Sequence, residues 1–170
     1  KQALLGMKAL NIRGLNITIP HKTTVIPLLD EVDELAGKIG AVNTVAVEKG
    51  KLVGYNTDAP GFLAALNQHD VEPAGKKVLL LGAGGAARAI AFILVEAQAE
   101  LFILNRREEI DWAYNIAKNI REHHPVNIRV DELNASNLPK SLTDTDILVN
   151  ATNIGMYPDD DKTLVPAGLL

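Results

Sequence analysis

The feature that most constrains this chain is a glycine-rich segment directly after an apolar run. Residues 78–81 read Val-Leu-Leu-Leu, and Gly82-Ala83-Gly84-Gly85-Ala86-Ala87 follows at once. The segment fits the pattern G-x-G-x-x-G/A, with Ala87 at the third small position. A helical pattern then runs over 85–97, so we predict a strand, a tight turn and a helix, which together open a βαβ unit. A tight turn without a ligand is the alternative interpretation.

The small residues of this segment suit a dinucleotide. Gly82 permits the tight turn, and Gly84 lets the main chain approach a pyrophosphate. The unpaired N–H groups at a helix start, together with the positive end of the helix dipole, attract that anion without a basic side chain. The expected cofactor contacts are Gly82, Ala83, Gly84, Gly85 and Ala86.

The rest of the second half alternates apolar runs with helical spacing. We expect strands at 101–104, 126–130 and 146–149, a helix over 110–120, and a short turn or helix at 138–142. Buried strands that alternate with crossover helices form a doubly wound parallel sheet. The predicted fold class is therefore α/β, with a Rossmann-type doubly wound parallel sheet preceded by part of a smaller α/β domain.

A polar stretch with Pro and Gly, residues 70–77, separates this half from the first. Such composition is typical of a linker, so we place a domain boundary there, between 1–72 and 73–170. In the first half we expect a short strand at 15–19 ended by Pro20, a helix over 30–39 ended by Gly40, a hairpin of 42–48 with 51–55, and a helix from Ala59 that Asp58 caps and that buries Phe62, Leu63 and Leu66.

Composition excludes several classes of protein. The 170 residues include 17 basic and 21 acidic side chains, a net charge of -4, so we expect no nucleic-acid partner. No apolar run approaches the roughly 18–20 residues that cross a bilayer, and we predict a cytoplasmic protein with no membrane partner. The absence of cysteine excludes disulfides, thiolate nucleophiles and cysteine-based zinc sites, and we predict no metal.

The end of the second expected strand bears on the choice of dinucleotide. An arginine there pairs with the 2′-phosphate of NADP, whereas an acidic residue bonds the ribose 2′-OH of NAD. Arg106 is the natural phosphate partner because a guanidinium is planar and permanently charged. Glu108 suits either a ribose hydroxyl or the positive end of the next helix. The expected contacts are Asn105, Arg106, Arg107 and Glu108, with NADP as the cofactor and NAD as the alternative.

In the first half, the residues that could carry chemistry are Lys22, Asn43 and Asp58. A ketone reductase needs a proton donor for the alkoxide that forms as hydride arrives, and a lysine held by a carboxylate can supply the proton. The alternatives are a solvated surface lysine and an aspartate that only caps a helix.

Six blocks in one order resemble the shikimate dehydrogenase family, and they cover nearly the whole chain. The blocks are 14–22 (GLNITIPHK), 40–44 (GAVNT), 54–58 (GYNTD), the glycine-rich segment, 105–106 (NR) and 150–156 (NATNIGM). The resemblance implies reversible, NADPH-dependent reduction of 3-dehydroshikimate to shikimate, in the pathway to chorismate and the aromatic amino acids. It also implies that 1–72 is the substrate-binding domain and 73–170 the NADP-binding domain.

The resemblance assigns a role to each matching residue. Lys22 and Asp58 match the catalytic pair, which also contacts the substrate. We expect the loop 150–156 near the nicotinamide, because the carboxyl ends of strands in an open sheet face the ligand crevice. The other matches are Thr18 and Asn43 for the substrate, Glu34 and Thr152 for the cofactor, and His21 as a spacer beside the lysine.

The chain also departs from the family pattern. Arg107 stands where the typical member has threonine, and this run is similar to the quinate/shikimate dehydrogenase branch, which accepts NAD or NADP and also oxidises quinate. The family has a Ser-x-Ser element before the first residue of this chain and continues past its last, so we expect truncation at both ends. A non-catalytic dinucleotide-binding module is the alternative from another class, and the oligomeric state stays open.

Overall fold

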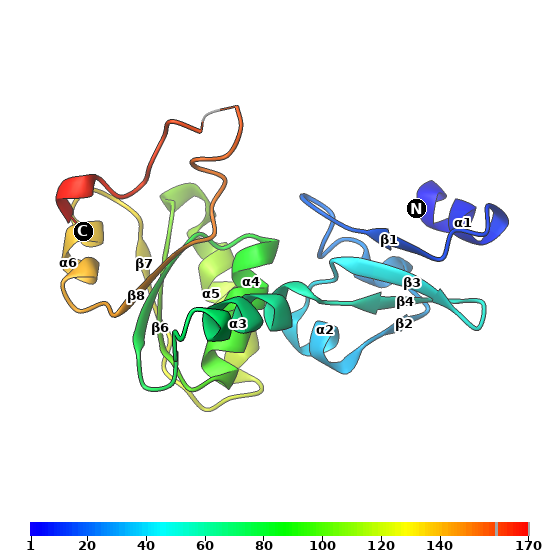
Figure 1. Cartoon of the computed structure of the whole chain (residues 1–170), viewed down its shortest axis with the longest axis horizontal. Coiled ribbons are helices and arrows are strands. Elements are labelled where there is room, and N and C mark those ends of the chain that lie inside the picture. Colours follow the sequence, from blue (N-terminus) through cyan, green and yellow to red (C-terminus); the bar gives the residue numbers. More distant parts are fainter. Residues whose placement is uncertain (159, 170) are drawn as a thin grey trace.

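The computed structural model describes residues 1–158 and 160–169. Figure 1 shows two sheets side by side along the long axis of the molecule, with helices between them. The sheet of strands β1–β4, with helices α1 and α2, is called the first lobe below. The sheet of strands β5–β8, with helices α3–α6, is called the second lobe.

The first lobe is a small mixed sheet in the strand order β1-β3-β4-β2. The strands are β1 Gly14–Asn16, β2 Glu31–Val32, β3 Thr44–Glu48 and β4 Lys51–Tyr55. Strands β3 and β4 form the predicted hairpin, whose turn uses positive φ at Lys49 and Gly50. Helix α1 (Gln2–Ala9) contributes Met7 to a core that β3 and β4 complete with Val45 and Leu52.

The second lobe contains the predicted parallel sheet, in the order β7-β6-β5-β8. Its strands are β5 Lys77–Leu81, β6 Glu100–Asn105, β7 Arg129–Glu132 and β8 Ile147–Asn150. Alternate residues of β5 face opposite layers: Val78 and Leu80 pack into the core with α4 (Gly85–Glu96) and α5 (Ile110–Arg121), whereas Leu79 and Leu81 face α6 (Asn137–Leu142). Both faces of β5 are thus buried, as an uninterrupted apolar run predicts.

Helix α3 (Asp58–Gln68) joins the lobes. It packs against α4, and Ala59 is fully buried in the same core as β5. Phe62, Leu63 and Leu66 lie on this packed side, as predicted. The polar stretch 70–76 then leads from α3 into β5, so residues on both sides of that stretch share one core.

Three predicted elements were wrong in extent. The first strand ends at Asn16 rather than at 19. The helix predicted over 30–39 begins only at Glu34 (α2, Glu34–Ile39), because Glu31–Val32 pairs with β4 as a short parallel strand and the Asp33 side chain caps the helix. The strand predicted at 126–130 is 129–132, since its pairing with β6 starts at Arg129.

The predicted capping role of Asp58 was also wrong. Asp58 is the first residue of α3, and its carboxylate is used elsewhere. The Asn56 side chain accepts the hydrogen bond from the N–H of Ala59 instead, at 3.1 Å. Within the described residues, no helix combines the length and the apolar character that a membrane span requires.

Candidate active site

Three segments of the first lobe converge through backbone hydrogen bonds. The N–H of Ile17, after β1, donates to the carbonyl of Asn43 at 2.6 Å, and the N–H of Val42 donates to the carbonyl of Lys22 at 2.8 Å. The N–H of Asn43 in turn donates to the carbonyl of Tyr55, at the end of β4, at 3.0 Å. These bonds place Lys22, Asn43 and the start of α3 side by side, although they are far apart in the sequence.

Lys22 and Asp58 form a tight ion pair at this junction. The Lys22 ammonium lies 2.6 Å from Oδ2 of Asp58, and the two side chains are 13% and 30% exposed. The other carboxylate oxygen, Oδ1, accepts a hydrogen bond from Nδ2 of Asn43 at 2.7 Å. Because charge-assisted bonds of this length are strong and directional, the carboxylate holds the ammonium in one orientation.

Asn43 is itself held on several sides. Its Oδ1 accepts from the Thr57 N–H at 2.9 Å and from the Thr44 hydroxyl at 3.0 Å, and its Nδ2 donates to Oγ1 of Thr57 at 2.9 Å. Thr57 was absent from the predicted site residues. Two sequence signals could have found it: Thr57 lies in the block 54–58 that resembles the family, and it stands between a strand and the start of a helix.

The glycine-rich segment adopts the predicted strand–turn–helix geometry. Gly82 has φ +102°, and a Cβ there would lie 2.9 Å from Cγ2 of Thr152, so both conformation and space require glycine. Gly84 is the N-cap of α4 and is extended, and no side chain caps this helix. Ala87 is fully buried, as expected at the point where helix and strand pack closely. The start of α4 therefore offers backbone N–H groups to an anion.

Lys22 of the first lobe lies against this segment. A Cβ built on Gly85 would be 3.0 Å from Cδ and 3.2 Å from Cβ of Lys22. The aliphatic stem of Lys22 thus crosses the N-terminus of α4 while its ammonium reaches Asp58. The structure brings together the lysine–aspartate pair and the glycine-rich segment, which lie in different predicted domains.

The carboxyl end of β6 carries the other predicted cofactor residues. Asn105 is buried, and its Nδ2 donates to the carbonyl of Glu109 at 2.6 Å. The Arg106 guanidinium is 64% exposed and pairs with the carboxylate of Glu109, which raises the pKa of Arg106. Arg107 and Glu108 are exposed in the short 3-10 helix Arg107–Glu109. Glu109 was not among the predicted site residues.

The loop after β8 lies beside the glycine turn. The N–H of Ala151 donates to the carbonyl of Leu81 at 2.9 Å, which fixes the start of the loop against the end of β5. Oδ1 of Asn150 accepts from the N–H and hydroxyl of Thr152, at 3.0 and 2.7 Å. Thr152 is therefore held in contact with Gly82, at the edge of the sheet where α/β folds bind ligands.

Three other predicted residues have surface positions. Thr18 is exposed in the loop between β1 and Lys22, and its carbonyl accepts from the N–H of His21 at 2.8 Å. His21 is exposed. Glu34 is paired with Lys38 of the same helix at 2.7 Å, which lowers the pKa of Glu34, so its contacts add no support for a cofactor role.

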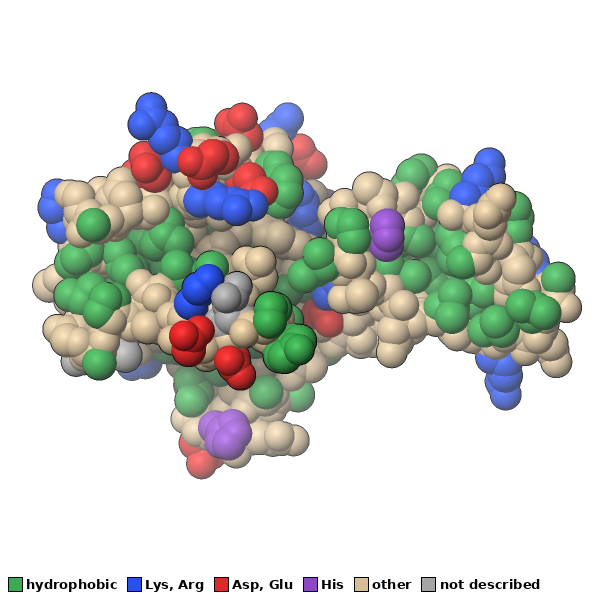
Figure 2. Space-filling model, turned by 90° about the horizontal axis from the view of Figure 1, so that it is seen from above, with side chains coloured by type: hydrophobic (Ala, Val, Ile, Leu, Met, Phe, Trp, Pro, Cys, Tyr) green, Lys and Arg blue, Asp and Glu red, His purple; other side chains and the backbone are tan. Residues whose placement is uncertain are grey.

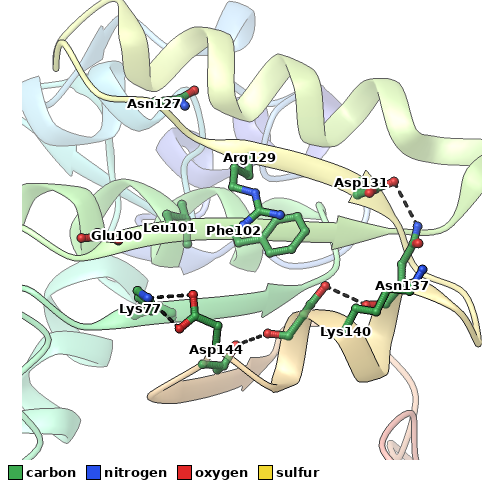
Figure 3. A pocket seen from close by; sticks show the side chains of 13 residues that line it. Lys77, Glu100, Leu101, Phe102, Asn127, Arg129, Asp131, Asn137, Lys140 and Asp144 are labelled. Atoms are coloured by element: carbon green, nitrogen blue, oxygen red, sulfur yellow. Dashed lines mark hydrogen bonds and ion pairs between the residues drawn. The ribbon is translucent and has the colours of Figure 1, made fainter.

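A groove of about 460 Å³ lies elsewhere on the second lobe (Figure 3). It runs from the amino ends of β5 and β6 to α6, with Arg129 stacked 4.5 Å over the Phe102 ring and Lys77 paired with Asp144. Because ligands of open α/β sheets bind at the carboxyl ends of the strands, we do not assign this groove to the active site. Over residues 1–158 and 160–169, no group of His, Asp and Glu side chains is arranged to hold a metal ion.

Fold and site together define a class: a protein with a Rossmann-type sheet and a glycine-rich turn, beside which a lysine of the first lobe pairs with the aspartate that starts α3. Comparison with known proteins then specifies the family. Residues 1–45 match the family model of the shikimate dehydrogenase substrate binding domain, and residues 64–157 match that of shikimate / quinate 5-dehydrogenase. The chain belongs to the shikimate / quinate dehydrogenase family.

Individual relatives agree with this assignment. A shikimate dehydrogenase (NADP(+)) from Carboxydothermus hydrogenoformans is 50% identical over 161 residues, which are 95% of this chain and 56% of that protein. The structure of shikimate 5-dehydrogenase from Thermus thermophilus in complex with NADP(H) and shikimate is 38% identical, with a TM-score of 0.81 over 99% of this chain and 58% of that one. Quinate dehydrogenase from Corynebacterium glutamicum in complex with NAD is 31% identical, with a TM-score of 0.86 over 99% and 59%. The chain thus spans less than two thirds of the length of each.

Proposed function

We propose that this chain carries the proton-transfer pair and the dinucleotide site of an NADP-dependent shikimate dehydrogenase, which reversibly reduces 3-dehydroshikimate to shikimate. One observation carries the proposal: the ammonium of Lys22 is 2.6 Å from Asp58 while the stem of the same lysine lies against Gly85. A proton donor and an anion-binding helix start therefore share one site. Family membership and the NADP-bound relative support the same activity.

Lys22 serves as the proton donor and acceptor in this proposal. Residues 82–86 and Arg106 would hold a nicotinamide cofactor, which would supply the hydride to the ring ketone. The carbonyl oxygen gains negative charge as the hydride arrives, and the Lys22 ammonium donates a proton to it. The neutral amine regains a proton from solvent. In the reverse direction the amine removes the hydroxyl proton, and Asp58 keeps the nitrogen in place throughout.

Thr18 and Asn43 complete the proposed substrate contacts. Asn43 lies within hydrogen-bond distance of Asp58, so its amide adjoins the reacting group. Thr18 has an exposed side chain four residues before Lys22, on the same connecting loop. A cyclic hydroxy acid presents several hydroxyl groups. Hydrogen bonds from Thr18 and Asn43 to these groups would position the substrate against the Lys22 ammonium.

NADP is the proposed cofactor. The pyrophosphate would lie on the N–H groups of 82–86, and the 2′-phosphate would pair with Arg106, assisted by Arg107. NAD, with quinate as a second substrate, is the alternative. It is favoured by Glu108 and Glu109 next to the arginines and by the NAD-bound quinate dehydrogenase among the relatives.

We also propose the division into a substrate domain, 1–72, and a cofactor domain, 73–170, with α3, near the end of the first, packed on the core of the second. One family model matches residues 1–45 and a different one matches residues 64–157, which supports two separate halves. A non-catalytic dinucleotide-binding module would have no use for a lysine–aspartate pair beside its glycine turn, so the pair favours an enzyme.

Reduced-cofactor absorbance with shikimate and NADP tests the proposal. Lys22→Ala should lower kcat by about 10²- to 10⁴-fold, the usual contribution of a positioned proton donor, and leave the Kd for NADP unchanged. Lys38→Ala, which removes a surface lysine of α2, is the control and should match wild type. A Lys22→Ala rate near wild type would refute the assignment. Turnover of quinate with NAD, equal to that of shikimate with NADP, would favour the alternative activity.

A further inference from the structure

Gly85 occupies a position where the dinucleotide pattern does not ask for glycine. In G-x-G-x-x-G/A the constrained positions are Gly82, Gly84 and Ala87, and Gly85 is an x. The backbone does not demand glycine either, because Gly85 is the first residue of α4 and, unlike Gly82, has no positive φ. The reason for a missing side chain at this position must lie in its neighbours.

The three heavy atoms nearest to a Cβ on Gly85 would all be carbons of Lys22. A Cβ there would lie 3.0 Å from Cδ, 3.2 Å from Cβ and 3.5 Å from Cγ of the lysine. Contacts of 3.0–3.4 Å are tighter than ordinary van der Waals packing, so the lysine stem would have to shift by a few tenths of an ångström. That stem cannot shift freely, because its ammonium is fixed on Asp58 at 2.6 Å and only 13% of the side chain is exposed.

We infer that Gly85 is a positioning residue for Lys22: its lack of a side chain provides the surface on which the lysine stem lies. This inference rests on the proposed role of Lys22 as the proton donor. One short segment would then have two roles: the N–H groups at the start of α4 would bind the cofactor phosphates, and the Cα of Gly85 would support the stem of Lys22. The position of the ammonium is then linked to the position of the cofactor.

Gly85→Ala separates these two tasks. The substitution keeps the backbone N–H groups, so the Kd for NADP should stay within about twofold of wild type. It moves the lysine stem, and because displacements near 1 Å at a reacting group can cost about 100-fold in rate, a shift of a few tenths of an ångström should lower kcat by about tenfold. Gly37→Ala is the matched control, because Gly37 is an exposed helical glycine with nothing within 4 Å of its added Cβ. Its kcat should equal that of wild type.

Thermal unfolding midpoints of the variants test the contact between Gly85 and Lys22 without an activity assay. Alanine is the better helix former, so Gly37→Ala should raise the midpoint. Gly85→Ala should lower it in the wild-type background and lower it less, or raise it, in the Lys22→Ala background, where the contacts with Cδ and Cγ are gone. This non-additivity is the signature of direct contact.

The outcomes separate the inference from the proposed function. If wild type turns over and Gly85→Ala has the same kcat, or if the midpoint shifts are additive, the positioning role is wrong. A parallel loss of NADP affinity would also refute it, because the glycine would then serve the cofactor alone. If Gly85→Ala does not fold, the double variant Lys22→Ala/Gly85→Ala should fold, and its failure would overturn the inference. If wild type shows no turnover, the proposed function fails, and the midpoints still decide the role of Gly85.

Discussion

We predict that the side chain of Asn56 makes a large contribution to the free energy of unfolding, although the residue lies in a short loop. It is a buried polar residue, 4% exposed, and both ends of its amide are used. Nδ2 donates to the carbonyl of Ala41 at 2.9 Å, and Oδ1 accepts from the N–H of Ala59 at 3.1 Å. One side chain thus joins the loop before β3 to the first turn of α3, the turn that carries Asp58.

Asn56→Ala would leave two buried backbone groups without partners. A lost helix cap costs about 1 kcal/mol, and a buried carbonyl left unpaired costs about 1–3 kcal/mol. The carbonyl of Ala41 and the N–H of Ala59 together predict a loss of about 2–4 kcal/mol in the free energy of unfolding. Asp58 lies two residues beyond, so the variant should also lower kcat by loosening the carboxylate that holds Lys22.

Urea unfolding followed by far-UV circular dichroism measures this loss. Asn67→Ala is the control, because Asn67 is an exposed asparagine of the same helix, and its variant should lie within about 0.5 kcal/mol of wild type. If Asn56→Ala is no less stable than Asn67→Ala, the two hydrogen bonds do not hold the start of α3, and the reasoning is refuted.

Three further predictions concern the cofactor site and the first lobe. Gly82→Ala should lower the free energy of unfolding by about 1–3 kcal/mol in urea and weaken NADP binding in calorimetry. The reason is that residue 82 has φ +102° and that its new Cβ would lie 2.9 Å from Thr152. An unchanged stability and an unchanged Kd would contradict this. Glu109→Gln should tighten binding of NADP, but not of NAD, by up to about fivefold, because it weakens the exposed ion pair that holds Arg106. An equal change for both cofactors would disprove selective competition. Hydrogen bonds from a backbone N–H and a lysine lower the pKa of Asp30 below its ordinary 3.8. The stability that Asp30 contributes is therefore present above that value and is lost as the pH falls through the lowered pKa. The free energy of unfolding of Asp30→Asn in urea should vary less with pH in that acid range than that of wild type.

The second lobe was predictable from sequence because local pattern and tertiary environment agree there. Strand β5 is apolar at 78–81 and buried on both faces, so its continuous run could only be a central strand. The glycine-rich turn carries its geometry in its own residues, most clearly in Gly82. Strand β7 was misplaced because its pairing with β6, rather than the alternation of apolar and polar residues over 126–130, determines where it starts.

The first lobe was harder because tertiary contacts override its local signals. Glu31–Val32 has only two residues in strand conformation, too few for a recognisable alternation, and it exists because β4 pairs with it. Asp58 has the sequence position of a helix cap, yet its carboxylate bonds Lys22 and Asn43, which leaves the capping to Asn56. A capping preference worth about 1 kcal/mol yields to a charge-assisted pair in a partly buried site.

The charge distribution indicates that an anionic ligand would be bound by a few local hydrogen-bond donors rather than attracted by an extended positive surface. Figure 2 shows basic and acidic side chains mixed over the second lobe, so the surface seen there has no extended area of one sign to attract an anionic ligand. A cofactor phosphate would instead depend on local donors: the N–H groups of α4, and Arg106 once it is released from Glu109. Selectivity between cofactors would then be decided by one ion pair at the end of β6.

The packing of α3 on α4 explains how residues of two lobes stay together in one site. Helix α3 starts with Asp58 and α4 starts with Gly85. The carboxylate that holds Lys22 and the glycine that its stem contacts therefore belong to two helices that share a core through Ala59 and Ala87. Any movement of the first lobe that carried Lys22 away from Gly85 would also have to break its bond to Asp58, which stays with the second lobe. The ion pair therefore ties the first lobe to α3, and because the proposed mechanism uses the same pair for proton transfer, a change at either member should alter both the contact between the lobes and the rate.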